Sequence, residues 1–257
     1  METKVALITG STSGIGMGIA KKFASEGYDI IFNGLEKDGP DIAEDIAKKN
    51  NVKSFYSAAN MLKPDEILKM ITDGEKKLGK INVLVNNAGI QFVSPIEDFP
   101  DEKWDAIIGI NLSASFHTCK AVWKSMKEKK HGRIINIASA HGLVASEFKS
   151  AYVAAKHGLV GLTKVLALEG GKHGITVNAI CPGYVKTPLV EKQIGEQAKA
   201  HGISEDEVVE KVMLSEQAVK QFTSIESVAD LAFFLTGNNC KTITGAALSI
   251  DGGWTAH

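Results

Sequence analysis

The sequence predicts an α/β protein with one doubly wound, parallel sheet of seven strands and helices on both faces. Short apolar runs alternate along the chain with longer amphipathic stretches, as expected when strands buried on both faces are joined by crossover helices. A glycine-rich loop separates the first apolar run from the first helical stretch. The 257 residues contain no linker, low-complexity tract or repeat, so we expect a single domain spanning 1–257.

The expected strands are short apolar or β-branched segments, and the expected helices show apolar residues at helical spacing. The strands are predicted at 5–9, 29–33, 52–57, 83–86, 133–138, 176–181 and 247–250. The helices are predicted at 16–26, 41–50, 64–78, 101–129, 150–172 and 226–235. Strands and helices therefore follow one another in the order that right-handed βαβ crossovers require.

The segment 188–224 interrupts this alternation between the sixth and the seventh strand. It is rich in Glu, Lys and Gln, and it is interrupted by Gly195 and Gly202. One interpretation is a solvated helical insertion, and the other is a mobile lid over a pocket. Because ligands bind at the carboxyl ends of the strands in such sheets, we expect a helical substrate lid.

The charge composition disfavours polyanion binding. Lysine and arginine number 29 against 30 acidic residues, and the formal net charge is -1, so neither nucleic acid nor an anionic membrane is an expected partner. Arg133 is the only arginine, so bound anions must rely on lysine, backbone N–H groups or neutral donors. Three widely spaced cysteines, Cys119, Cys181 and Cys240, suggest neither a metal site nor a disulfide framework. With no signal peptide and no apolar run of membrane-spanning length, we expect a cytoplasmic protein without a metal.

The glycine-rich loop after the first strand has the features of a phosphate site. Its glycines follow the spacing G-x-x-x-G-x-G between a strand and a helix. Glycine permits the tight turn, and the N-terminus of the following helix offers unpaired backbone N–H groups to phosphate oxygens. A tight turn without a ligand is the alternative, but the flanking strand and helix favour dinucleotide binding. The loop residues concerned are Gly10, Thr12, Ser13, Gly14, Ile15 and Gly16.

Further motifs follow the loop in a fixed order. They are Asn86-Asn87-Ala88-Gly89, Ser139 behind a strand, Tyr152-Val153-Ala154-Ala155-Lys156, and Pro182-Gly183-Tyr184-Val185-Lys186-Thr187-Pro188. The ordered set closely resembles the short-chain dehydrogenase/reductase family over residues 4–254. This resemblance implies a Rossmann-type fold, a nicotinamide dinucleotide cofactor and hydride transfer between that cofactor and an alcohol or carbonyl group.

The resemblance also implies where the dinucleotide binds. Asn60 departs from the family, which usually has aspartate there beside adenine, but its amide oxygen can accept from the adenine amino group. Leu35 can pack beside adenine, and Glu36 would repel the 2′-phosphate of NADP, whereas Lys37 is an opposing observation. We therefore expect NAD as the cofactor. The implied cofactor-binding residues are Gly10, Thr12, Ser13, Gly14, Ile15, Gly16, Leu35, Asn60, Met61, Asn87, Ala88, Gly89, Tyr152, Lys156, Pro182, Gly183, Val185 and Thr187.

Tyr152 and Lys156 lie four residues apart on a predicted helix, so both project from one face. For this pair alone, an exposed amphipathic face is the alternative. An ordinary tyrosine is a poor base at neutral pH, but a lysine ammonium and the charge of oxidised nicotinamide lower its pKa. We therefore expect Tyr152 to act as the general acid/base. The resemblance implies that Ser139 orients the substrate oxygen and that Asn111 supports a water relay to Lys156.

Polar residues surround the expected catalytic group and suit a small carboxylate. Each has a simpler alternative, such as a solvated loop lysine or a histidine bonded only to backbone. The predicted substrate-binding residues are Gln91, Ser139, His141, Lys149, Tyr152 and Gln193. Within the family, this set is similar to that of the D-3-hydroxybutyrate dehydrogenases. The similarity implies interconversion of D-3-hydroxybutyrate and acetoacetate with NAD.

Two aromatic residues, Tyr184 and Trp254, are expected near the substrate. Tyr184 stands where that subfamily usually has tryptophan, and it keeps an aromatic wall that is smaller and carries a hydroxyl. Trp254 either reaches a neighbouring subunit's pocket or packs the end of the chain.

The alternative functions are a short-chain enzyme for another small alcohol, a sugar or a 3-oxoacyl thioester, and a non-catalytic dinucleotide-binding protein. The resemblance also suggests a homotetramer packed through helices 101–129 and 150–172.

Overall fold

The computed structural model describes residues 4–256, so residues 1–3 and 257 of the predicted domain lie outside the described residues. Its centre is a sheet in the order β3-β2-β1-β4-β5-β6-β7, in which all neighbouring strands run parallel. The predicted seven-stranded, doubly wound α/β fold is confirmed. The strand order reverses between β1 and β4, which is where such sheets bind ligands. The strands are β1 (Lys4–Ile8), β2 (Tyr28–Asn33), β3 (Ser54–Ser57), β4 (Val83–Asn86), β5 (Gly132–Ile137), β6 (Ile175–Pro182) and β7 (Ala247–Ile250).

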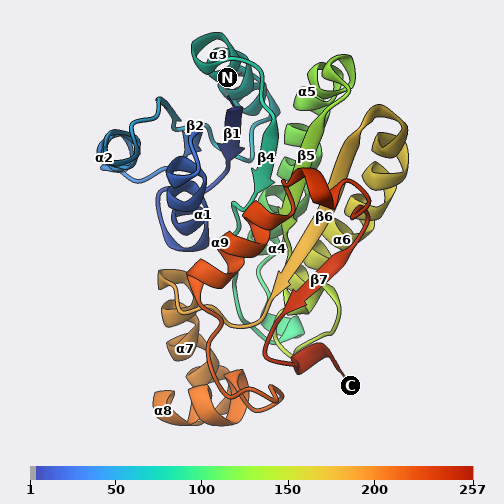
Figure 1. The fold of residues 1–257 in the computed structure, drawn as a ribbon. Helices are drawn as coiled ribbons and strands as arrows, with labels where there is room; N and C mark the ends of the chain where they lie inside the picture. The colour runs from blue at the N-terminus through green and yellow to red at the C-terminus, as the bar shows by residue number, and fades with distance from the viewer. Residues whose placement is uncertain (1–3, 257) are drawn as a thin grey trace.

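Alternate residues of β1 show how the two faces of the sheet are covered. Ala6 and Ile8 pack in one core cluster with α1 and α9, whereas Val5 and Leu7 pack in a second cluster with α3 and α5. This is the period of two that a strand imposes on its side chains. Figure 1 shows α1 and α9 in front of the sheet. The helices are α1 (Gly14–Ser25), α2 (Gly39–Asn50), α3 (Pro64–Leu78), α4 (Asp101–Ile108), α5 (Ala114–Lys129), α6 (Ser150–Gly170), α7 (Pro188–His201), α8 (Glu205–Val208) and α9 (Ile225–Phe234).

The predicted continuous helix 101–129 is wrong. The structure divides it into α4 and α5 by a π-helical turn, Gly109–Ser113, which contains Asn111. A π-turn adds one residue to a helical turn and is frequent at functional sites. The apolar spacing resumes in α5, so the periodicity of the sequence does not reveal the extra residue. Every other predicted strand and helix agrees with the structure within two residues at each end.

The predicted lid segment is helical, but its description as a solvated insertion is incomplete. Gly195 lies within α7, and only Gly202, with a φ of 67°, ends that helix. A single glycine costs a helix only about 1 kcal/mol, so the rest of α7 tolerates it. The apolar side of the segment packs in a cluster at the carboxyl ends of the strands, at the bottom of Figure 1. The buried members of this cluster are Ala140, Tyr184, Val190, Val208, Met213 and Trp254. Among residues 4–256, no helix has the length and apolarity needed to cross a membrane.

Candidate active site

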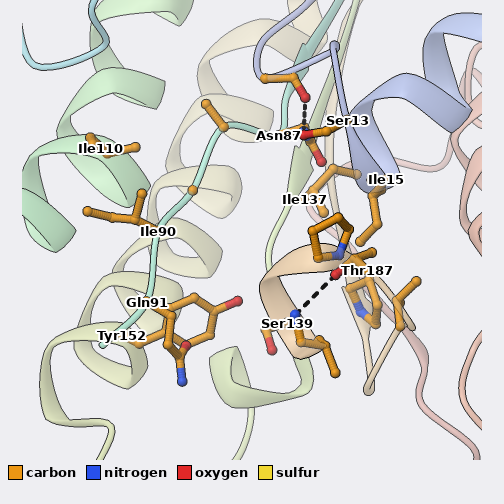
Figure 2. Close-up of a pocket in the computed structure, with 18 of the residues that line it drawn as sticks. Ser13, Ile15, Asn87, Ile90, Gln91, Ile110, Ile137, Ser139, Tyr152 and Thr187 are labelled. Carbon is orange, nitrogen blue, oxygen red and sulfur yellow. Dashed lines mark hydrogen bonds between the residues drawn. The ribbon is translucent and has the colours of Figure 1, made fainter. Parts of the chain in front are cut away.

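A cavity of about 340 Å³ opens at the carboxyl ends of β1, β4, β5 and β6. It extends from the glycine loop to Trp254. Figure 2 shows Ser13 and Asn87 near one end of this cavity, and Gln91 and Tyr152 nearer the other. All predicted site residues line this cavity except Thr12, Gly16 and Asn111. The structure therefore brings the cofactor set and the substrate set into one continuous space.

The glycine loop lines the cavity with a backbone that suits an anion. Gly10 and Gly14 have φ angles of 60° and 50°, a region that glycine adopts without steric cost. Ser13 precedes α1 and makes no side-chain cap hydrogen bond, so the first N–H groups of the helix remain available to an anion. A Cβ on Gly16 would overlap the Gly10 carbonyl oxygen and the Asn87 amide. Gly16 thus permits the close packing beneath the loop, and the cradle fits a pyrophosphate.

Thr12 lies behind the loop and holds Glu36 instead of lining the cavity. The Thr12 hydroxyl donates to the Glu36 carboxylate, which also accepts from Ser13 Oγ at 3.3 Å and from the Leu35 backbone N–H at 3.0 Å. Burial raises the pKa of Glu36, but these hydrogen bonds outweigh it and hold the pKa below its ordinary value. A charged carboxylate is therefore fixed in the part of the cavity that follows β2.

Asn87 fixes the glycine loop, whereas Asn60 lies after β3 and bonds its own segment. Asn87 Nδ2 donates to the carbonyl oxygens of Thr9 and Gly10, both at 3.0 Å. Asn60 lines the cavity as predicted, but its Oδ1 accepts from the Leu62 backbone N–H at 2.9 Å. Of the oxygen's two lone pairs, that hydrogen bond leaves one for adenine.

Asn111 lies behind the cavity wall, where the π-turn places it. Its Oδ1 accepts from the Ile90 backbone N–H, and its Nδ2 donates to the Ile90 carbonyl, both at 2.9 Å. Both amide groups are thereby used to hold the strand-to-loop segment that carries Gly89 and Gln91. The side chain is buried and does not line the cavity. Its contacts are those of a residue that positions the segment after β4.

Tyr152 and Lys156 project from α6 into the cavity, next to Ser139 at the end of β5. Lys156 Nζ donates to the Ile137 carbonyl at 2.7 Å and lies 5.4 Å from the centroid of the Tyr152 ring. Burial raises the pKa of Tyr152 to about 12, although a hydrogen bond with Ser139 lowers it. Burial lowers the pKa of Lys156 to about 8. Lys156 is not among the groups that shift the Tyr152 pKa in this structure, where burial has the largest effect.

Lys149 is one of the most deeply buried charged groups of the cavity, with 1% of its surface exposed. Its Nζ donates to the Tyr184 hydroxyl at 2.7 Å. Burial lowers the pKa of Lys149 to about 7. The alternative of a solvated loop lysine is therefore wrong.

His141 is held beside Ser139 in the same part of the cavity. Its backbone N–H donates to Ser139 Oγ at 3.1 Å, and its ring Nδ1 lies 3.3 Å from that oxygen. Burial, and then the charge of Lys149, lower the pKa of His141 well below its ordinary value, so the ring is neutral near pH 7. His141 Nε2 and Gln91 Nε2 are buried without a hydrogen-bond partner. Such orphaned groups are costly, and here a small anion in the cavity would satisfy them. Among residues 4–256, no three His, Cys, Asp or Glu side chains are grouped to hold a metal ion.

Trp254 packs the end of the chain, as one of its two predicted alternatives states, and it also lines the cavity of its own chain. Its indole stacks on the Tyr184 ring, with centroids 5.5 Å apart and planes inclined by 10°, and it meets the His141 ring edge-on at 5.0 Å. Gln193 is also buried and lines the cavity, so α7 contributes directly to its wall. The other lining residues, which the sequence analysis did not select, are mostly apolar. They are Asn33, Gly34, Ala59, Ile90, Ile110, Ile137, Ala138, Pro188 and Val190.

Comparison with known proteins agrees with this geometry. The family model described as short chain dehydrogenase matches residues 4–198. The chain belongs to the short-chain dehydrogenase family. The predicted family, and with it the prediction of an enzyme rather than a silent dinucleotide-binding protein, are confirmed.

Within the short-chain dehydrogenase family, the chain has relatives of similar length. It is 54% identical to "D-beta-hydroxybutyrate dehydrogenase" of Rhizobium meliloti, over 99% of this chain and 100% of that one. It is 49% identical to the protein of the same name from Cupriavidus necator, over 99% and 98% of the two chains. Among solved structures, the crystal structure of a variant of actinorhodin polyketide ketoreductase with NADPH superposes with a TM-score of 0.94 at 31% identity, over 99% and 98% of the two chains.

Proposed function

We propose that this short-chain dehydrogenase interconverts D-3-hydroxybutyrate and acetoacetate with NAD. The observation that carries the proposal is the donor set formed by Lys149, His141 and Gln91 next to Tyr152 and Ser139. Its size and charge suit a small carboxylate whose hydroxyl carbon is held at Tyr152. The names of the two relatives above support the same substrate.

The chain's own residues divide the chemistry between them. In oxidation, Tyr152 Oη takes the proton of the substrate hydroxyl, while Ser139 Oγ donates a hydrogen bond to the same oxygen. In reduction, Tyr152 returns that proton to the carbonyl oxygen. When bound, oxidised nicotinamide supplies the hydride acceptor and a positive charge that lowers the pKa of Tyr152 from its raised value. Lys156 uses one N–H for the Ile137 carbonyl and has two more for the ribose hydroxyls.

Glu36 makes NAD the preferred dinucleotide. Its carboxylate is held by Thr12, Ser13 and the Leu35 backbone, beside the place where the adenosine ribose binds. A diol can donate to this carboxylate, whereas a 2′-phosphate would be repelled by it. The single arginine, Arg133, is buried and donates to the carbonyls of Gly132 and Gly174, so it is not part of a phosphate clamp.

The remaining aspects of the proposal concern assembly and setting. The segment 188–224 acts as a lid, because Gln193 on α7 is buried against the cavity. Exposed apolar side chains on α5 and α6, such as Phe116 and Leu168, support a homotetramer packed through these helices. The cytoplasm is the proposed location, and ketone-body metabolism is the proposed setting because acetoacetate and D-3-hydroxybutyrate are the proposed substrates.

The test is a substrate panel measured with NAD⁺ and NADP⁺ separately. It contains 2-, 3- and 4-hydroxy acids, the methyl ester of D-3-hydroxybutyrate and neutral secondary alcohols. We expect the highest kcat/KM with D-3-hydroxybutyrate and NAD⁺. Turnover of neutral alcohols alone, or turnover of long 3-oxoacyl thioesters with NADPH alone, would replace this proposal.

A further inference from the structure

The Lys149 ammonium has an unusual partner in this cavity. Nζ lies 2.7 Å from the Tyr184 hydroxyl oxygen and 4.9 Å from the centroid of the same ring. The exposed surfaces of Lys149 and Tyr184 are 1% and 5%, so solvent contributes little to either. One ammonium hydrogen is directed to Tyr184, and two others remain for a ligand in the cavity.

Tyr184 is the fixed member of this pair. Its ring stacks on Trp254 and meets the edge of His141 at 6.2 Å. Its backbone carbonyl accepts from the Thr223 N–H at 2.8 Å. Lys149, in contrast, has a long side chain with many rotamers, whose ordering costs conformational entropy. The Tyr184 hydroxyl therefore fixes the position of Lys149 Nζ, whereas Lys149 does not fix the position of the Tyr184 ring.

The charges around Lys149 leave the ammonium dependent on Tyr184. The titratable groups that share its part of the cavity are His141 from the turn after β5, Tyr152 and Lys156 from α6, and Tyr184 itself. None of them is an anion near neutral pH, since burial raises the pKa of both tyrosines to about 12. Among the described residues that line the cavity, Glu36 is the only carboxylate, and it follows β2 at the cofactor end. The Tyr184 hydroxyl oxygen is thus the group that favours the charged form of Lys149.

We propose that Tyr184 is a positioning residue that determines specificity: its hydroxyl holds the Lys149 ammonium in place for a substrate carboxylate. The inference rests on the proposed function, because it requires an acidic substrate. Tyr184 then sets the preference for hydroxy acids over neutral alcohols without taking part in proton or hydride transfer.

The variant Tyr184→Phe tests this proposal, because it removes one oxygen and keeps the stacked ring. We expect KM for D-3-hydroxybutyrate to rise about tenfold, as for the loss of a hydrogen bond to a charged group. We expect kcat to stay within about twofold, because Tyr152 and Ser139 are unchanged. KM for methyl D-3-hydroxybutyrate and for NAD⁺ should not change. The alkaline fall of kcat/KM for the acid should begin at lower pH, because the ammonium has lost its acceptor. Equal changes for acid and ester, or an unchanged KM for the acid, would overturn the proposal.

Two further variants separate this proposal from the proposed function. Tyr28→Phe is the matched control, because Tyr28 is also buried and carries Lys4 Nζ 5.5 Å from its ring centroid at the other end of the sheet; all kinetic constants should be unchanged. In a Lys149→Ala background, Tyr184→Phe should have no further effect on KM for the acid. An additional tenfold rise in that KM would contradict the claim that Tyr184 acts by positioning Lys149. If Lys149→Ala itself affects acid and ester equally, the proposed function fails. If Lys149→Ala is selective and Tyr184→Phe is not, only the present inference fails.

Discussion

The two ends of the cavity differ in the groups that form their surface: backbone groups at the cofactor end and buried side chains at the substrate end. At the cofactor end, the glycine loop and the N-terminus of α1 present backbone N–H groups, and Glu36 is the one carboxylate among the described residues that line the cavity. At the substrate end, buried side chains from separate segments form the surface, and they include a lysine with little exposure to water. Recognition by backbone N–H groups depends on glycines, because a side chain at those positions would prevent close approach. Recognition by buried side chains depends on individual atoms, because charges interact more strongly where water is excluded.

Tyr152 belongs to both the predicted cofactor set and the predicted substrate set, and its removal should have the largest effect. We expect Tyr152→Phe to reduce kcat by about a thousandfold, the scale of a lost general acid/base. The dissociation constant for NADH, measured by fluorescence titration, should change little. Retention of more than about a tenth of kcat would contradict the role of Tyr152.

Lys149→Ala should show the strength of the substrate end. Removing the cation leaves a bound carboxylate without its charged partner, so kcat/KM for D-3-hydroxybutyrate should fall about a hundredfold, or about 2.7 kcal/mol. The methyl ester should be affected less than about threefold. Lys172→Ala, which removes an exposed lysine after α6, is the control and should leave both substrates unaffected. A similar loss for acid and ester would remove Lys149 from carboxylate binding.

Glu36→Gln should weaken the discrimination at the cofactor end. It removes the charge and keeps the shape, so KM for NADP⁺ should fall about tenfold, while KM for NAD⁺ changes less than about threefold. Glu97→Gln removes an exposed charge on the turn before α4 and should have no effect on either cofactor. If NADP⁺ use does not improve, Glu36 does not set the cofactor preference.

A pH series should distinguish the titration of Lys149 at the substrate end from that of Tyr152 without any mutation. Near pH 7, we expect its effect on kcat/KM to be the smallest of the four effects predicted here. The pKa of Lys149 is lowered to about 7, so the ammonium that binds a carboxylate is lost as the pH rises through 7. The ratio of kcat/KM for the acid to that for the ester should therefore decrease about tenfold per pH unit at alkaline pH. Using this ratio cancels the titration of Tyr152, which both substrates share. A ratio that is constant from pH 6 to 9 would contradict a titrating lysine in the acid's site.

The fold and the cofactor end could be predicted from the sequence because each depends on local patterns. The apolar runs give the strands, and the spacing of Gly10, Gly14 and Gly16 gives the loop. The substrate end of the cavity could be predicted from the sequence only in part. Lys149 and His141 stand close to the family motifs, but the stacking of Tyr184 on Trp254 joins residues from the two sides of the lid segment. Contacts between such distant residues leave no periodic signal in a single sequence.

The π-turn at Asn111 illustrates a different limit. One extra residue in a turn changes the helix locally, yet the apolar faces of α4 and α5 each keep their normal period. Thr12 and Gly16 show the same point on the loop, because spacing identifies them as members of the motif without showing that they lie behind its ligand-facing surface. Sequence patterns therefore identify the parts of the site better than they identify which atoms face the ligand.

The choice of lysine as the cation of the substrate end has a consequence for the covalent reactivity of the protein. A surface lysine near its ordinary pKa is an amine in only about one molecule in a few thousand at neutral pH. Lys149, whose pKa is about 7, is an amine in about half of the molecules at that pH. Amines, unlike ammonium groups, are nucleophiles. Small acylating reagents that enter the cavity should thus label Lys149 ahead of the many exposed lysines, and a bound hydroxy acid should protect it.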